Sequence, residues 1–197
     1  MRAHRHMVVG KMMTVEARQL FRLGNEVLAF RFTATMSDRA GEAPQERLSS
    51  PARLKLWLHA AGLGVPDVSP AELQDALTLR EAIHRAGLAV TVGRRPDPGD
   101  AAILNRAAAA GQSSPTLDEN GLAVWNLGEE TPVPDALGVL AADAIHVLGG
   151  PDRDRIKACD GPGCAGLFLD TSRGASRRWC SMNTCGNRVK KARLANK

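Results

Sequence analysis

Four cysteines, the only ones in this chain of 197 residues, lie within its last forty residues. They are Cys159, Cys164, Cys180 and Cys185, and they follow the pattern C-x4-C-x15-C-x4-C. This is the spacing of a structural zinc site, in which each pair forms a knuckle and a hairpin between the pairs brings the knuckles together. Zinc favours tetrahedral sulfur ligation, and four thiolates leave no open coordination position. We therefore expect these cysteines to bind one structural Zn²⁺.

Two other readings of the cysteines are less favoured. Two disulfides are possible, but the preceding 150 residues contain no cysteine, and thiolates that hold a metal fit a reducing cytoplasm better. A catalytic site with three ligands would need a nearby histidine, and the nearest is His146, thirteen residues before Cys159. Gly161, Pro162 and Gly163 stand within the first pair, where they would let backbone N–H groups face the sulfurs.

The positive charge of the chain is concentrated at its C-terminal end. The net charge is +5, but segment 171–197 has eight Arg or Lys and no Asp or Glu, so it carries +8 and the rest sums to −3. Such a tail predicts a polyanion partner, because cationic side chains that neutralise phosphates release counterions. Alternatively, these residues only neutralise the zinc and its four thiolates, which together carry about −2. The predicted nucleic-acid contacts are Arg173, Arg177, Arg178, Arg188, Lys190, Lys191 and Arg193, with Arg188, Lys190 and Lys191 as the first candidates for phosphates.

Upstream of the cysteines, segment 27–36 alternates between two faces. Leu28, Phe30, Phe32, Ala34 and Met36 share one of them. This period of two predicts a half-buried strand, which could pair with segment 14–23 across the Gly24-Asn25 turn.

Capping signals then predict helices. They begin at Ser50-Pro51, at the capping box Ser69 to Glu72, at Asp97-Pro98 and at about Asp135, and they end near Gly62, Ala86, Gly111 and Leu148. A hairpin is expected over 116–127, with a type I′ turn at Asn120-Gly121. After Cys185, a short basic helix is expected over 186–194. Residues 151–155 are the expected hinge.

Together these elements predict an α+β fold. A mostly helical N-terminal domain with a few antiparallel strands (1–150) would precede a small treble-clef-like zinc finger (151–197). Trp57 and Trp125 are expected in the core. Arg80, on an apolar helical face, would pair with a buried acid or bind an anionic effector. No segment predicts a membrane span or a catalytic nucleophile, so we expect neither a membrane protein nor an enzyme.

The cysteine-rich segment resembles the bacterial CGNR zinc-finger family, named for a tetrapeptide found here as Cys185 to Arg188. The similar motifs are Phe168-x-Asp170-Thr-Ser172, Arg177 to Met182 and Thr184 to Arg188, and upstream Leu54-x-x-Trp57-Leu58, Leu79 to Ala82 and Ile103 to Asn105. The resemblance implies a stress-induced transcription regulator with an N-terminal partner domain. That domain usually carries Asp-Phe-x-Asn-Thr on an early strand, where this chain has Arg31-Phe32-Thr33-Ala34-Thr35.

The primary hypothesis is a cytoplasmic bacterial regulator whose finger binds DNA and whose body senses a small-molecule effector or forms a homodimer. The alternative is a finger that contacts protein or RNA without recognising DNA directly. RNA is disfavoured, because single-stranded RNA is usually held by exposed aromatic rings and this tail offers only Phe168 and Trp179. A third possibility is a body with a small-molecule site of its own and a finger that serves as a cap. On the first hypothesis, Cys180→Ser should lose zinc and unfold the finger while the body stays folded.

Overall fold

The computed structural model describes residues 15–195, and the expected α+β fold is confirmed. The N-terminal region is mostly helical, and the described residues also form three small antiparallel sheets of two strands each. The helices are α1 (Val15–Leu20), α2 (Leu28–Thr33), α3 (Pro51–Ala60), α4 (Pro70–Thr91), α5 (Pro98–Ala110), α6 (Pro132–Gly149) and α7 (Asn187–Ala195), with the short turns η1 (Arg153–Arg155) and η2 (Met182–Gly186). The strands are β1 (Met36–Ser37), β2 (Gln45–Glu46), β3 (Ser114–Leu117), β4 (Ala123–Asn126), β5 (Ile156–Ala158) and β6 (Leu167–Leu169).

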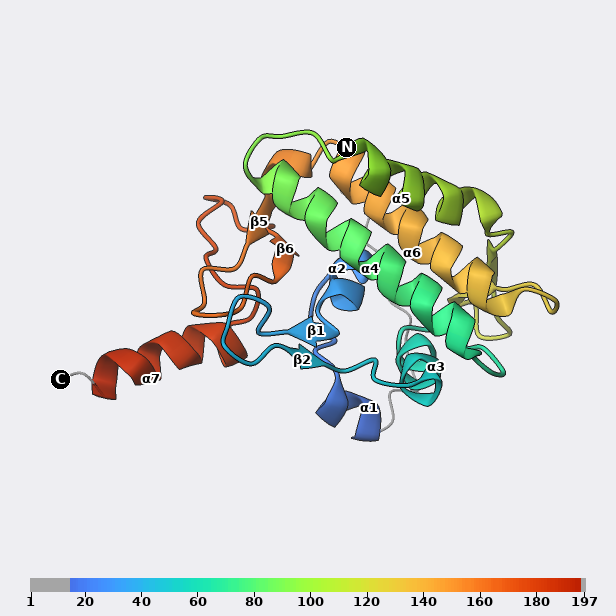
Figure 1. Ribbon diagram of the computed structural model, residues 1–197, viewed down its shortest axis with the longest axis horizontal. Coiled ribbons are helices and arrows are strands. Elements are labelled where there is room, and N and C mark those ends of the chain that lie inside the picture. Colours follow the sequence, from blue (N-terminus) through green and yellow to red (C-terminus); the bar gives the residue numbers. More distant parts are fainter. Residues whose placement is uncertain (1–14, 196–197) are drawn as a thin grey trace.

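Three long helices, α4, α5 and α6, lie side by side and form one layer of the molecule (Figure 1). Their predicted starts are largely confirmed. Ser69 and Glu72 form the capping box of α4, and the Asp97 carboxylate accepts a hydrogen bond from the backbone N–H of Gly99 at the start of α5. The ends and lengths differ: α4 continues to Thr91, and α6 already begins at Pro132. Local signals missed in the sequence set these limits. Gly93 ends α4 with a φ of 72°, where the Arg94 N–H closes the helix on the Ala89 carbonyl, and Pro132 takes the first position of α6.

The predicted strand over 27–36 is wrong, because most of this segment is the helix α2. Both sides of it are buried, since Ala29 and Thr33 are as enclosed as Phe30 and Phe32. Val27, at the N-cap position of α2, has no side chain that can cap the helix. Instead, the Asp143 carboxylate of α6 accepts a hydrogen bond of 2.8 Å from the Ala29 backbone N–H. A cap supplied from another helix satisfies the free N–H of the first turn.

The expected strand partner over 14–23 is wrong too. Its described part contains α1, and Asn25 does not turn a hairpin but accepts a hydrogen bond from the backbone N–H of Val27. Thr14 lies outside the described residues. With both segments helical, the expected N-terminal hairpin is replaced by the short pairing of β1 with β2.

The hairpin near Asn120 is confirmed, but its turn type is not. Strands β3 and β4 pair from Ser114 with Asn126 to Leu117 with Ala123. A type I′ turn needs positive φ at both central residues, whereas here Gly121 has φ of 74° and Asn120 is not among the residues with positive φ. The longer loop is ordered by Asp118, whose carboxylate accepts from the backbone N–H groups of Asn120 and Leu122.

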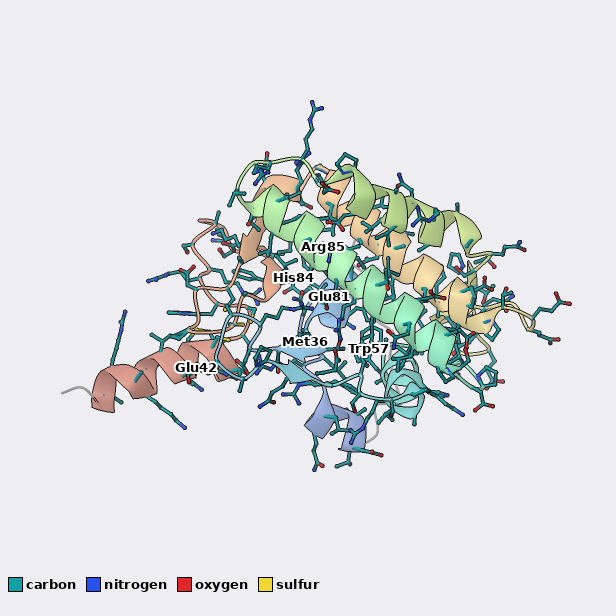
Figure 2. All side chains as sticks on the ribbon, in the orientation of Figure 1. Met36, Glu42, Trp57, Glu81, His84 and Arg85 are labelled. Carbon is teal, nitrogen blue, oxygen red and sulfur yellow. The ribbon has the colours of Figure 1, made fainter. Side chains whose placement is uncertain are left out.

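Arg80 pairs with acids, as one of the two readings of the sequence predicted. Its guanidinium is buried and donates to both carboxylate oxygens of Glu46, at 2.7 and 2.6 Å, and to Glu81 at 2.8 Å. Arg39 adds a second bridge to Glu81 at 2.6 Å. These pairs attach the β1–β2 segment to α4, where Figure 2 shows Glu81 beside His84 and Arg85.

The segment expected to be a hinge leads directly into strands that belong to the main core. Ile156 of β5 and Leu167 and Leu169 of β6 are buried in the same hydrophobic cluster as the helices of the body. Gly87 of α4 makes room for this contact, because a Cβ at that position would lie 2.3 Å from Leu167 Cδ1. The body and the cysteine-rich region therefore share one core across residues 151–155.

The two tryptophans of the body lie in this core, as expected. Trp57 is buried against Phe32, with 5.0 Å between the ring centroids, and Trp125 packs on the edge of the core.

Candidate metal centre and its basic surroundings

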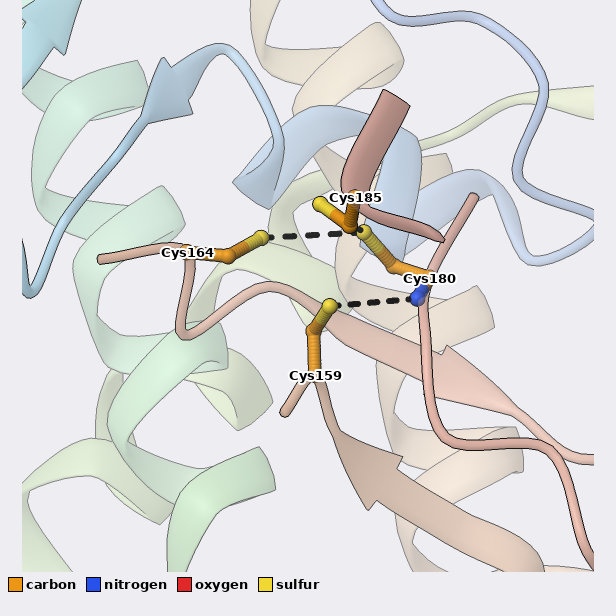
Figure 3. Close-up of side chains that lie close together, drawn as sticks. All are labelled: Cys159, Cys164, Cys180 and Cys185. Carbon is orange, nitrogen blue, oxygen red and sulfur yellow. Dashed lines mark hydrogen bonds between the residues drawn. The ribbon is translucent and has the colours of Figure 1, made fainter. Parts of the chain in front are cut away.

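The four predicted zinc ligands converge at one point (Figure 3). Their Sγ atoms all lie within 4.8 Å of one another, and the Cys164–Cys180 and Cys180–Cys185 sulfur pairs are 3.7 Å apart. A regular tetrahedron with Zn–S bonds of about 2.3 Å has edges of about 3.8 Å, so the sulfur positions fit zinc. The cysteines form a closed site for one structural Zn²⁺.

The first ligand pair forms a knuckle between β5 and β6. Cys159 follows β5 directly, and its backbone N–H donates to the Gly166 carbonyl at 2.8 Å. As expected from the glycines, backbone N–H groups point at sulfur: those of Gly161 and Cys180 lie 3.4 and 3.3 Å from Cys159 Sγ. Gly161 is required there, because a Cβ would lie 2.9 Å from the Cβ of Cys185. The strands thus enclose the first pair, whereas we expected a hairpin between the two pairs.

The second ligand pair is positioned by a helix start. Ser181 follows Cys180 and caps η2 by accepting from the backbone N–H of Thr184, and Cys185 lies in η2 just before α7. The Arg177 guanidinium donates to the Cys180 carbonyl at 2.6 Å and stacks over the Phe168 ring at 4.7 Å. The knuckle, the strands and this terminal helix make up the expected treble-clef-like finger.

Hydrogen bonds among the four sulfur atoms give the cysteine thiols different pKa values. They lower the pKa of Cys159 below that of an ordinary thiol, with Cys164 as the first partner, and raise the pKa of Cys180, with Cys159 as the first partner. A divalent cation at the centre would favour the thiolate form of all four groups. Zinc uptake therefore releases protons, and zinc affinity falls as the pH falls.

A buried carboxylate, Asp170, orders the loop that joins the two ligand pairs. It accepts from Lys157 Nζ at 2.7 Å, from the Ser172 hydroxyl at 2.6 Å and from the Arg177 backbone N–H at 2.9 Å. These partners, with Lys157 first, hold the pKa of Asp170 well below its usual range. We had not assigned this role to Lys157. The available signal was Asp170 itself, the last acid before the wholly basic segment 171–197.

The body binds the first knuckle through side chains that the sequence analysis did not select. Asn25 donates from its side-chain amide to the Leu167 carbonyl at 2.8 Å, and His84 Nε2 donates to the Ala165 carbonyl at 2.9 Å. Burial is the main reason that the pKa of His84 is lowered, so the ring is neutral. The two residues of each contact are more than 80 positions apart in the sequence, so no local motif could indicate the role of Asn25 or His84.

A second contact joins the segment after β1 to the finger. The backbone N–H of Ala40 donates to the Gly163 carbonyl at 3.0 Å, and Arg188 donates to Asp38 at 2.7 Å. Arg22 approaches the other oxygen of Asp38 at 3.4 Å. Asp38 has a positive φ of 55°, so this carboxylate stands on a sharply turned backbone.

The structure divides the seven predicted nucleic-acid contacts into three groups. Arg177 is half-buried and used by the finger itself, while Arg178 pairs with Asp160 and Arg188 with Asp38. The remaining four are exposed, and none of them forms an ion pair with another described residue. They are Arg173 in the loop before Cys180 and Lys190, Lys191 and Arg193 on α7.

Comparison with known families agrees with this arrangement. Residues 26–151 match the ABATE family, described as "Putative stress-induced transcription regulator", and residues 155–197 match the CGNR zinc finger. No curated protein matches the chain. Among the described residues, no helix is both long and apolar enough to cross a membrane. The first match covers more than half of the chain, so the chain belongs to the ABATE family and carries a C-terminal CGNR zinc finger.

Proposed function

We propose that the chain regulates transcription by binding DNA through its zinc finger, with α7 as the main contact. The observation that carries the proposal is the position of α7, which begins at the zinc cluster and extends away from the rest of the molecule (Figure 1). Its nine residues include Lys190, Lys191 and Arg193, which are exposed, and no acid. An α-helix fits the major groove of DNA, and cationic side chains on it can contact the flanking phosphates.

The experiment is fluorescence anisotropy of the zinc-loaded chain with a random-sequence duplex over a range of salt concentrations. In the Lys190→Ala/Lys191→Ala/Arg193→Ala variant, three phosphate contacts are lost. The slope of log affinity against log salt should then become shallower by about 2.7, at about 0.9 per contact. The matched control is Arg94→Ala/Arg95→Ala/Arg106→Ala, which removes three exposed arginines from the body. Equal slopes in the two variants would contradict the proposal.

Asp38 gives a second test with the opposite sign. Its pairing with Arg188 keeps that guanidinium from a phosphate, so Asp38→Asn should make Arg188 available and steepen the salt slope by about 0.9. Asp67→Asn is the control, since Asp67 is an exposed acid of the body that pairs with Lys55. A slope that is unchanged in Asp38→Asn would show that Arg188 serves only the contact between the body and the finger.

The alternative is a finger that binds a protein. It is favoured by Leu194 of α7, which is 72% exposed and lies one helical turn from Lys190. An RNA partner has less support, because Phe168 is buried and Trp179 is half-buried against the zinc cluster, with Arg178 over its ring at 5.7 Å. Retention of DNA binding in Leu194→Ala, together with its loss in the triple α7 variant, would favour DNA over a protein partner.

The remaining parts of the proposal concern the body. We propose that residues 1–150 form the body and residues 151–197 the finger. We further propose that the protein acts in the cytoplasm, forms a homodimer and has a regulatory rather than an enzymatic role. The description of the family as a transcription regulator supports the last of these. Sedimentation equilibrium of the zinc-loaded chain tests the dimer, and a monomer at all concentrations would exclude it.

A further inference from the structure

A cleft of about 600 Å³ separates the N-terminal segment of the body from the finger. One wall is formed by α1 and the chain that follows it, together with β1. The other is formed by the second half of the knuckle and the start of η2. The cleft therefore lies between the body and the finger, where a bound molecule would touch both.

Arginine side chains make the cleft walls positive, and the zinc–thiolate cluster, of which Cys164 and Cys180 line the cleft, offsets part of this charge. Arg18, Arg22, Arg47 and Arg177 line the cleft, and no Asp or Glu is found among the described residues that do. Asp38, which is not part of the lining, pairs with Arg22 at 3.4 Å and is also held by Arg188 at 2.7 Å. Arg18, Arg22 and Arg47 thus supply the positive charge for a ligand, since the Arg177 guanidinium is bound to the Cys180 carbonyl and the Phe168 ring.

The arginines differ in how firmly they are held. Arg47 donates to the Leu20 carbonyl at 2.9 Å and to the Ser37 hydroxyl at 3.3 Å, so its charge is fixed at the wall. Burial lowers the pKa of Arg47, and the like charge of Arg22 lowers it further. Arg18 is exposed and Arg22 half-buried, so both can turn toward a ligand. An anion bound near Arg22 and Arg47 would relieve the repulsion between these two guanidinium groups.

The rest of the lining is mixed: polar side chains such as Asn25, Asn183 and Thr184 alternate with an apolar part. Leu20 and Met36 contribute from the body and Met182 from the finger, where Met182 is 49% exposed. Figure 2 shows Met36 at β1, on the side of the body that meets the finger. Methionine side chains adapt to ligands of varied shape, and a surface of this kind favours a partner with an apolar portion.

From these observations we infer that the cleft between α1 and the zinc finger binds a small organic anion, in which a carboxylate or phosphate group is joined to an apolar body. Arg18 and Arg22 bind the anionic group, Arg47 supplies a fixed positive charge, and Met36 and Met182 cover the apolar part. This inference is independent of DNA binding, because it concerns other residues and can be measured without DNA.

The test uses the zinc-loaded full chain and the probe 8-anilino-1-naphthalenesulfonate, a sulfonate on an aromatic body. Fluorescence titration should show one saturable site, and Arg18→Gln/Arg22→Gln should weaken it about tenfold, because charge-assisted hydrogen bonds are lost. The control is Arg94→Gln/Arg95→Gln, which removes the same charge from the exposed loop after α4. It should bind the probe as the wild type does. Zinc content and circular dichroism verify that each variant is folded.

A variant on the opposite wall keeps the test decisive if the arginine variant is unstable. Asn183→Asp places a negative charge on the finger side of the cleft at an exposed position, and it should also weaken the probe. Competition with benzoate and with phenyl phosphate then distinguishes a carboxylate from a phosphate ligand. The inference is overturned if the probe does not saturate, if both arginine variants bind alike, or if neither competitor displaces it.

Discussion

A basic side chain beside a zinc–thiolate cluster can serve the fold of the finger or an outside partner, and its hydrogen-bond partners separate the two roles. Arg177 has the first role, because it binds the Cys180 carbonyl and the Phe168 ring. Lys190 and Lys191 are free of such partners among the described residues and are exposed. Arginines and lysines that contribute equally to the net charge thus have different roles. A substitution of Arg177 should weaken zinc binding, whereas a substitution of Lys190 or Lys191 should weaken only the binding of DNA.

His84 makes the stability of the body–finger contact depend on pH. Burial is the main cause that lowers its pKa, and Arg39 and Arg80 lower it further, while the hydrogen bond to Ala165 and the charge of Glu81 oppose them. The unfolded chain, with a histidine pKa of about 6.5, therefore binds a proton that the folded chain rejects. Stability contributed by the neutral ring is complete above about pH 6.5 and is lost progressively as the pH falls below it.

The measurement is the free energy of unfolding in urea at pH 7.5 and pH 5.5 for the wild type and His84→Gln. Glutamine can still donate a hydrogen bond to Ala165 but does not titrate, so the variant should lose less stability on acidification. Because protonation of the cysteines affects both proteins equally, the difference between them isolates His84. An identical loss in both proteins would show that His84 has no part in the pH dependence.

At the scale of elements, close packing between α4 and β6 holds the finger against the body. Gly87 lies where the two elements approach, and Leu167 fills the space that a side chain would occupy. Leu167 is only 2% exposed, so it has little room to move. A glycine inside a long helix usually weakens it, and here the contact with the finger explains why glycine stands there.

Gly87→Ala therefore tests that interface. Alanine gains about 0.5–1 kcal/mol in helix stability, but overpacking a filled core costs about 1–3 kcal/mol. We expect a net loss of about 1–2 kcal/mol in the free energy of unfolding, measured by urea denaturation. Gly149→Ala at the end of α6 is the control, because a Cβ there meets no atom within 4 Å. Equal or greater stability in Gly87→Ala would contradict the role of this contact.

At the scale of the whole molecule, the zinc site supports more than the finger. Ile156, Leu167 and Leu169 belong to the body's core, and the knuckle is hydrogen-bonded to His84 and to Ala40. Loss of the metal should therefore destabilise the body as well. This revises the simpler expectation from the sequence, in which the finger unfolds and the body is unaffected.

Cys180→Ser provides the measurement. Zinc content should fall from one ion per chain to none, and the thermal unfolding of the helices, followed by circular dichroism, should shift down by about 5 °C or more, at about 2–4 °C per kcal/mol. Ser176→Ala, at an exposed position of the loop between the ligand pairs, is the control and should retain zinc. An unchanged melting temperature of the helices in Cys180→Ser would mean that the body folds independently of the finger.

The zinc ligands, the basic terminal helix and most helices of the body could be predicted from the sequence alone. These depend on local signals: the spacing of four cysteines, the caps at Ser50 and Ser69, and a run of charge without acids. Such signals act over a few residues, so they can be read without knowing the fold.

Contacts between segments that are distant in sequence depend on tertiary packing. Residues 28–33 are helical because α6 caps them and the core encloses both of their faces, and this outweighs a strand-like alternation. The roles of Asn25, Asp38 and His84 and the arginine-lined cleft likewise depend on neighbours remote in sequence. Packing free energy is shared among such neighbours, and no local pattern records which of them will come into contact.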